Sequence, residues 1–282
     1  MESTLFLYID ILGFSDLIRD TTRVEQLYKI IDNARLHRDS NYRTIVFSDT
    51  VLAYHAHSNL TGKSKATELM FLIELTQELF LRLVGSGIYF RAVITEGSFH
   101  HKKFENLEAF YGQALIDAYR AEKSIPSIGL FLDNKLRKFN LVFRWRIFSP
   151  QYDFIYLTHH CTSLMPTSEE SFFPSSLSEF NPFVDPEFPL PGLILTSTGS
   201  ESLVYPEIIH FSEVYNQMNE HPDPNVRVKH LAAWNMYCLG YPKLMRSLVD
   251  HEFAPEGLAE LDWTEVKRRF EEGLVLKPHA QL

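Results

Sequence analysis

Two aspartates lie where the sequence otherwise reads as buried strand. Asp10 ends an apolar run that begins at Thr4, and Asp49 lies inside the run from Thr44 to Ala53. A carboxylate in such a setting is costly unless it is paired, hydrogen-bonded or bound to a cation. Carboxylate oxygens are also the ligands that hard divalent cations prefer. The pair favours a divalent-metal site, and the alternative is two unrelated aspartates that each make a local turn.

Apolar periodicity predicts the elements that must position these acids. Glycine follows several of them, and Ser15 is expected to cap the first helix. Strands are expected over 4–11, 88–95, 128–132 and 141–147, the last pairing with 151–158, and a hairpin over 41–55 with Asp49 near its tip; helices are expected over 15–38, 64–84 and 112–123.

The order strand-helix-strand-strand-helix-strand predicts an α+β protein with a ferredoxin-like β-α-β-β-α-β domain over residues 1–160. Such a sheet places the end of the first strand beside the hairpin, which brings Asp10 and Asp49 together. Residues 161–282 are expected to be a partly helical extension that packs on the core or on a dimer. Within it, 161–190 is dense in serine, proline and phenylalanine, which favours an extended packed segment, and 226–239 and 263–273 read as helices.

Four motifs resemble the catalytic domain of class III nucleotidyl cyclases, over about residues 4–158. Asp10-Ile11-x-Gly13-Phe14-Ser15 is similar to the motif that opens that domain, and Asp49 lies where the family has its second metal aspartate. Ser48 stands where a glycine usually precedes that aspartate. The strand Arg91–Gly97 and the helix Gly112–Arg120 are similar to the two later motifs, with Val93 and Thr95 as departures. The resemblance implies a palm-type cyclase domain.

The resemblance also implies roles for these residues. Asp10 and Asp49, with the Ile11 carbonyl, would hold two Mn²⁺ or Mg²⁺ ions. The ions would activate a ribose 3′-hydroxyl and polarise the α-phosphate of a nucleoside triphosphate. Backbone amides around Gly13, Phe14 and Ser15 would bind phosphate at a helix start. Arg120 is the third catalytic residue, and it would donate to the α-phosphate across a homodimer interface, so that each active site is composite.

The positions that select the base depart from the purine cyclases. Ile45 and Ala109 stand where that family reads the purine, and Ile116 replaces the asparagine that positions the ribose. The chain thus resembles the pyrimidine cyclases of Pycsar antiphage systems, whose cyclic UMP or cyclic CMP activates a separate effector. UTP is favoured over CTP by the resemblance alone.

Further candidates for the base pocket are Phe47, Tyr54 and Arg91. Tyr54 could narrow the pocket or be an ordinary half-buried strand aromatic, and Arg91 could donate to the base. Lys135, Lys138 or one arginine of Arg144-Trp145-Arg146 could bind the triphosphate tail. Two other functions stay open, a purine cyclase with unusual base readers and an inactive cyclase-like regulatory module.

The composition limits the classes of partner and the cellular location that we expect for this protein. The formal charge of −9 argues against binding a nucleic-acid polymer, and Cys161 and Cys238 are too few for a disulfide framework. The first residues lack the basic and apolar regions of a signal peptide, and 70–75 is too short and charged to span a membrane, so we expect a cytoplasmic protein. The pair His55 and His57 is interpreted as surface imidazoles, and the adjacent pairs at 100–101 and 159–160 as poor metal sites.

Overall fold

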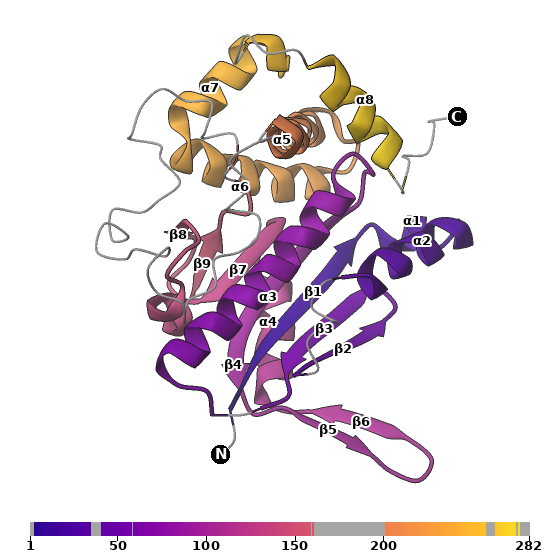
Figure 1. Ribbon diagram of the computed structural model, residues 1–282, viewed down its shortest axis with the longest axis vertical. Coiled ribbons are helices and arrows are strands. Elements are labelled where there is room, and N and C mark those ends of the chain that lie inside the picture. Colours follow the sequence, from indigo (N-terminus) through magenta and orange to yellow (C-terminus); the bar gives the residue numbers. More distant parts are fainter. Residues whose placement is uncertain are drawn as a thin grey trace.

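The computed structural model describes residues 3–34, 41–57, 59–158, 160, 201–257, 263–274 and 276. The segment predicted to be extended, 161–190, lies outside these residues. A seven-stranded sheet in the order β2-β3-β1-β4-β7-β9-β8 forms the centre (Figure 1). Its strands are β1 (Thr4–Leu12), β2 (Tyr42–Phe47), β3 (Thr50–His55), β4 (Tyr89–Gly97), β7 (Gly129–Asp133), β8 (Trp145–Ile147) and β9 (Tyr152–Ile155).

The first four strands have the predicted ferredoxin-like topology. β1 lies between β3 and β4 and is antiparallel to both, and β2 and β3 form the expected hairpin. β7 then runs parallel to β4, and β8 pairs with β9 as expected, although it covers only 145–147 rather than 141–147. The α+β class is confirmed.

Side-chain alternation along β1 assigns the two faces of the sheet. Leu5, Leu7 and Ile9 pack in one cluster with α2 (Thr21–Asp32) and α3 (Gly62–Leu83). Phe6 and Tyr8 point the other way, against the small residues Ala114 and Ala118 of α4 (Gln113–Ser124). Because alternate residues of a strand face opposite sides, Asp10 shares the α4 face with Phe6 and Tyr8.

Two elements of the first half differ from the sequence prediction. The single helix expected over 15–38 is wrong: α1 (Phe14–Leu17) ends early, and the Asp20 carboxylate accepts hydrogen bonds from the Thr22 and Arg23 amides at 3.0 and 3.2 Å, which starts α2. The turn expected around His100 is a two-stranded ribbon, β5 (His100–Lys103) with β6 (Glu108–Tyr111), which projects from the sheet (Figure 1). The 3₁₀-helix η2 (Asn134–Phe139) follows β7.

Helices of the C-terminal part gather at the end of the sheet opposite the ribbon (Figure 1). They are α5 (Glu201–Glu220), α6 (Pro224–Gly240), α7 (Pro242–Asp250), the 3₁₀-turn η6 (Pro255–Gly257) and α8 (Thr264–Gly273). The helices expected at 226–239 and 263–273 correspond to α6 and α8, whereas α5 and α7 were not predicted. Gly240 permits close packing, because a Cβ there would lie 2.5 Å from the Tyr156 ring. No helix among the described residues is long and apolar enough to cross a membrane.

Two titratable side chains of α5 face the rest of the fold, His210 being buried and Glu213 partly buried. The Gly85 amide donates to the Glu213 carboxylate at 3.4 Å, and burial raises the pKa of Glu213 to about 7. His210 contacts the Tyr237 hydroxyl at 3.0 Å, and burial lowers its pKa to about 3. Both therefore favour their neutral forms in the folded protein.

Replacing Glu213 by glutamine should remove part of the pH dependence of stability. The wild-type carboxyl ionises near 4.5 when unfolded and near 7 when folded, so its contribution falls as the pH rises through this range. The free energy of unfolding of Glu213→Gln should rise relative to wild type by up to about 3 kcal/mol between about pH 4 and about pH 8. Urea unfolding followed by circular dichroism measures this difference.

His210 acts in the opposite direction, because a histidine held neutral destabilises the fold as the pH falls below 6.5. It is present in both proteins and cancels in the comparison. Parallel stability curves for wild type and Glu213→Gln would contradict the raised pKa of Glu213.

Candidate active site

The main chain at Asp49 lies against the end of β1 that carries Asp10. Asp10 lies directly opposite Thr50, the residue after Asp49, and the Ile11 amide donates to the Asp49 carbonyl at 2.8 Å. Ser48, with φ 55°, occupies the left-handed region in the hairpin turn. The β2–β3 hairpin thus brings Asp49 to Asp10, as the predicted topology requires.

Asp10 also belongs to a buried charged cluster. Arg91 lies directly opposite it on β4, and the Arg91 Nη2 contacts the Asp10 carboxylate at 3.2 Å. The same Nη2 donates to the carboxylate of Glu122 on α4, and Nη1 donates to the Ile125 carbonyl at the end of that helix. Burial raises the pKa of Glu122; Arg91 opposes this effect, while the field of Asp10 and a side-chain hydrogen bond with Asp10 add to it.

Glu122 was not among the residues singled out in the sequence. Its position carried a signal, because it follows the buried Ala114 and Ala118 at intervals of four and so continues the sheet-facing side of α4. Burial raises the pKa of the Tyr8 phenol, and the fields of Glu122, Asp10 and Asp49 act in the same direction. Tyr8 thus lies within electrostatic reach of all three carboxylates.

The predicted phosphate-binding residues lie at the start of α1. Gly13 has φ 74°, and it takes the cap position that had been assigned to Ser15. Its carbonyl accepts from the Asp16 and Leu17 amides at 3.0 and 3.2 Å. The Phe14 and Ser15 amides begin the helix and so have no acceptor within it. Phe14 is buried, and Ser15 is exposed.

Arg120 lies in a different place from the aspartates. It lines an open cleft of about 510 Å³ together with Asp117, Asp133, Lys135 and Tyr152, among others. Its guanidinium makes no hydrogen bond or ion pair with any residue that the structure describes. Ile116, one turn earlier, is also exposed on α4. Within one subunit, Arg120 is therefore not brought to Asp10 and Asp49.

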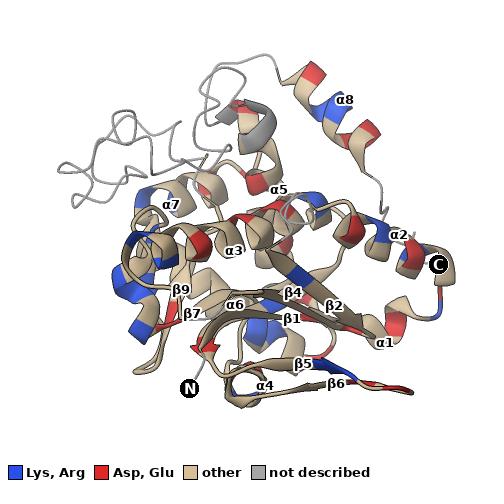
Figure 2. Ribbon diagram, turned by 60° about the horizontal axis from the view of Figure 1, so that its bottom comes forward, with Lys and Arg blue, Asp and Glu red and all other residues tan. Residues whose placement is uncertain are grey.

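Lysines and arginines cluster beside β7 and β9 (Figure 2). Several have structural contacts: Arg137 donates twice to the buried Asp153 at 2.7 and 2.6 Å, and Arg146 donates to the Leu239 carbonyl at 2.6 Å. Lys135 is exposed, lies 4.0 Å from the Asp133 carboxylate and lines the cleft with Arg120. The cleft therefore holds two cations beside two carboxylates, Asp117 and Asp133.

The residues predicted to line the base pocket lie in different places and differ in exposure. Ile45 and Tyr54 pack in one apolar cluster, and the Tyr54 hydroxyl contacts His101 Nδ1 of the ribbon at 2.9 Å. Ala109 lies on the same ribbon, while Phe47 is 79% exposed at the end of β2. Arg91 is buried in the charged cluster with Asp10 and Glu122.

The donor set at Asp10 and Asp49 fits hard divalent ions. Two carboxylates and a main-chain carbonyl supply oxygen ligands, and Mg²⁺ in nucleotide sites takes one or two carboxylates and completes its shell with substrate phosphates and water. Asp10, Ile11 and Asp49 could therefore supply protein ligands to such ions. Over the described ranges, no group of three or more His, Cys, Asp and Glu residues is arranged to hold a metal by itself.

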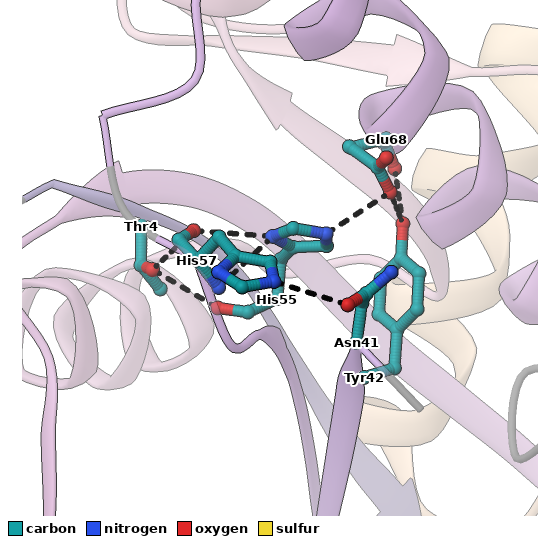
Figure 3. Close-up of polar contacts among 6 residues, drawn as sticks. All are labelled: Thr4, Asn41, Tyr42, His55, His57 and Glu68. Atoms are coloured by element: carbon teal, nitrogen blue, oxygen red, sulfur yellow. Dashed lines mark hydrogen bonds and ion pairs between the residues drawn. The ribbon is translucent and has the colours of Figure 1, made fainter. Parts of the chain in front are cut away.

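His55, the last residue of β3, and His57 just after it belong to a separate polar cluster (Figure 3). His55 is buried, not a surface imidazole as predicted, and lies 3.5 Å from the Glu68 carboxylate, which also accepts from the Tyr42 hydroxyl. The Thr4 hydroxyl donates to the His55 carbonyl at 3.1 Å. Thr4 begins β1, so this cluster lies about 20 Å from Asp10 along the strand. Its contacts join β1, β2, β3 and α3.

Comparisons with known proteins give structural likeness only. No protein-family model matches the chain, and no curated protein is similar to it in sequence. The adenylyl cyclase CyaB from P. aeruginosa is 12% identical, with a TM-score of 0.42, and the match covers 55% of this chain and 94% of that chain. A guanylyl cyclase domain of the RhoGC fusion protein from the aquatic fungus Blastocladiella emersonii is 13% identical, with a TM-score of 0.41, covering 55% and 93%.

Substitution of Gly112, where α4 begins, should disrupt the helix that carries Arg120 and Glu122. A Cβ at Gly112 would lie 2.1 Å from the Ser98 carbonyl oxygen, and φ is 155°. Gly112→Ala should lower the free energy of unfolding by at least about 3 kcal/mol. Gly87→Ala is the matched control, with positive φ but no atom within 4 Å, and should cost about 1 kcal/mol. Chemical denaturation measures both variants, and an equal loss of unfolding free energy in the two would contradict the close contact at Gly112.

Proposed function

We propose that this chain is a nucleotidyl cyclase that converts UTP, or CTP, to its 3′,5′-cyclic monophosphate and pyrophosphate. The observation that carries the proposal is that the hairpin turn with Asp49 lies against the end of β1, beside Asp10, through the Ile11 amide and the Asp49 carbonyl. Acids at such a strand end are unfavourable without cationic partners, and their oxygen donors suit divalent ions.

In this mechanism Asp10, Asp49 and the Ile11 carbonyl would hold two Mn²⁺ or Mg²⁺ ions, which would lower the pKa of the ribose 3′-hydroxyl and polarise the α-phosphate. The 3′-hydroxyl gives its proton to water, and its oxygen forms a bond to the α-phosphorus as the bond to pyrophosphate breaks. The amides of Phe14 and Ser15 bind phosphate oxygens, because they begin a helix and Gly13 lets the substrate approach the backbone closely.

Arg120 acts in this proposal on the site of a second subunit. Its cleft is separate from Asp10, and its exposed guanidinium has no partner among the described residues, which suits a donor that meets a phosphate across an interface. Lys135 in the same cleft would take the triphosphate tail. The ribbon ends in the exposed apolar residues Phe104 and Leu107, and we assign this surface to the homodimer as well.

The pyrimidine preference rests on the side chains near the hairpin. Ile45 is packed among apolar residues, and Ala109 has no polar side-chain atom, so neither can read a purine edge. The Tyr54 hydroxyl is held by His101, which gives the cluster a fixed polar atom. By its resemblance to Pycsar cyclases, the product would be a second messenger of bacterial antiphage defence that activates a separate effector.

Incubation of the purified protein with Mn²⁺ and each of ATP, GTP, CTP and UTP tests this function. Mass spectrometry should detect a cyclic pyrimidine nucleotide, UTP being the preferred substrate. Asp10→Ala and Asp49→Ala should each reduce turnover by at least about 1,000-fold, because each removes a metal ligand. Turnover of purines alone would show a purine cyclase, and no turnover of any nucleotide would favour a regulatory module.

Mixing two inactive variants tests the composite site. Asp49→Ala and Arg120→Ala should each be inactive alone, whereas a heterodimer of the two contains one site in which both residues are intact. Random exchange of subunits at equal concentrations should therefore restore about one quarter of wild-type activity. Absence of any recovery, with subunit exchange confirmed by native mass spectrometry, would contradict the assignment of Arg120 to the partner's site.

A further inference from the structure

Three buried charged side chains join β1, β4 and α4 at the candidate active site. Asp10, Arg91 and Glu122 have side-chain exposures of 17%, 7% and 12%. Antiparallel pairing sets Asp10 directly opposite Arg91, so their side chains leave the sheet on the same face. Glu122 reaches Arg91 from the helix that covers this face.

Arg91 is held from two sides. Its Nη1 donates to the Ile125 carbonyl at the C-terminal end of α4, where the helix dipole favours a cation. Its Nη2 is shared between Asp10 at 3.2 Å and Glu122. Arg91 thus contacts Asp10 through one carboxylate oxygen, Oδ2, and not through the paired geometry that arginine and carboxylate adopt when free to do so.

We propose that Glu122 is a positioning residue, which rests on the function proposed above. Glu122 draws Arg91 toward α4, and this keeps Arg91 from closing on both oxygens of Asp10. The Asp10 carboxylate therefore stays available to a divalent cation. Without the carboxylate of Glu122, Arg91 would pair fully with Asp10 and compete with that cation.

The same contact links two halves of the catalytic apparatus. Glu122 lies two residues after Arg120 on α4, so the bridge from Asp10 through Arg91 to Glu122 joins the metal carboxylate to the helix that carries the phosphate donor of the other site.

Mn²⁺ binding to the full-length protein, followed by electron paramagnetic resonance without nucleotide turnover, tests the role of Glu122. Glu122→Gln keeps the shape of the side chain and should weaken Mn²⁺ binding by about ten-fold, the scale usual for residues that orient a metal ligand. Glu96→Gln is the matched control. It removes a carboxylate paired with Lys65 at 2.6 Å at the other end of β4, and it should leave the affinity unchanged.

A double-mutant cycle with Arg91→Lys separates positioning from simple loss of charge. Lysine cannot form the fork that bridges Asp10 and Glu122, so Glu122→Gln should change Mn²⁺ affinity by less than about two-fold in that background. Thermal melting checks that each variant is folded. If Glu122→Gln does not fold, Glu122→Asp, which withdraws the carboxylate by one methylene, should weaken binding in the same direction.

The outcomes distinguish the two proposals. A wild-type protein that binds Mn²⁺, with unchanged affinity in a folded Glu122→Gln variant, would overturn the positioning role and leave the cyclase assignment intact. Equal losses from Glu122→Gln in the wild-type and Arg91→Lys backgrounds would also overturn it. A wild-type protein that neither binds Mn²⁺ nor turns over a nucleotide would overturn the proposed function and this inference with it.

Discussion

The register of β1 against its two neighbours is the constraint on which the site depends. One shared strand sets Asp10 opposite Thr50 on β3 and opposite Arg91 on β4. A slip of one residue would turn Asp10 into the apolar cluster formed with α2 and α3, and would bury a carboxylate without a partner. Leu5, Leu7 and Ile9 on that face make such a slip unfavourable, so the apolar core fixes the position of the acid.

Much of this arrangement could be predicted because it follows from local patterns. Alternating and continuous apolar runs located the first four strands, and their order implied the hairpin beside β1. The segments that carry Asp10 and Asp49 were accordingly expected to be adjacent, and their main chains are. The break between α1 and α2 was also readable in principle, since Asp20 precedes two residues whose amides it caps. The break was missed because the apolar residues on both sides of Asp20 recur at helical spacing.

Other features could not be read from local pattern, because they depend on contacts between distant residues. Glu122 reads as one more charge on an amphipathic helix until α4 is placed on the sheet and Arg91 is found beneath it. His55 likewise reads as a surface residue, although α3 supplies Glu68 to cover it. The ribbon β5–β6 has strands of four residues each, too short for periodicity to distinguish from a turn.

The charges around Asp10 explain how one buried cluster can serve both stability and chemistry. Arg91 pairs with two carboxylates that would otherwise be largely buried without a cationic partner, which offsets part of their desolvation cost. Two carboxylates against one guanidinium still leave an excess negative charge, and Asp49 adds another nearby. That excess is what a divalent cation would neutralise. Glu122 supplies one of the two carboxylates that pair with Arg91, and its place on α4 joins that helix to β1 and β4.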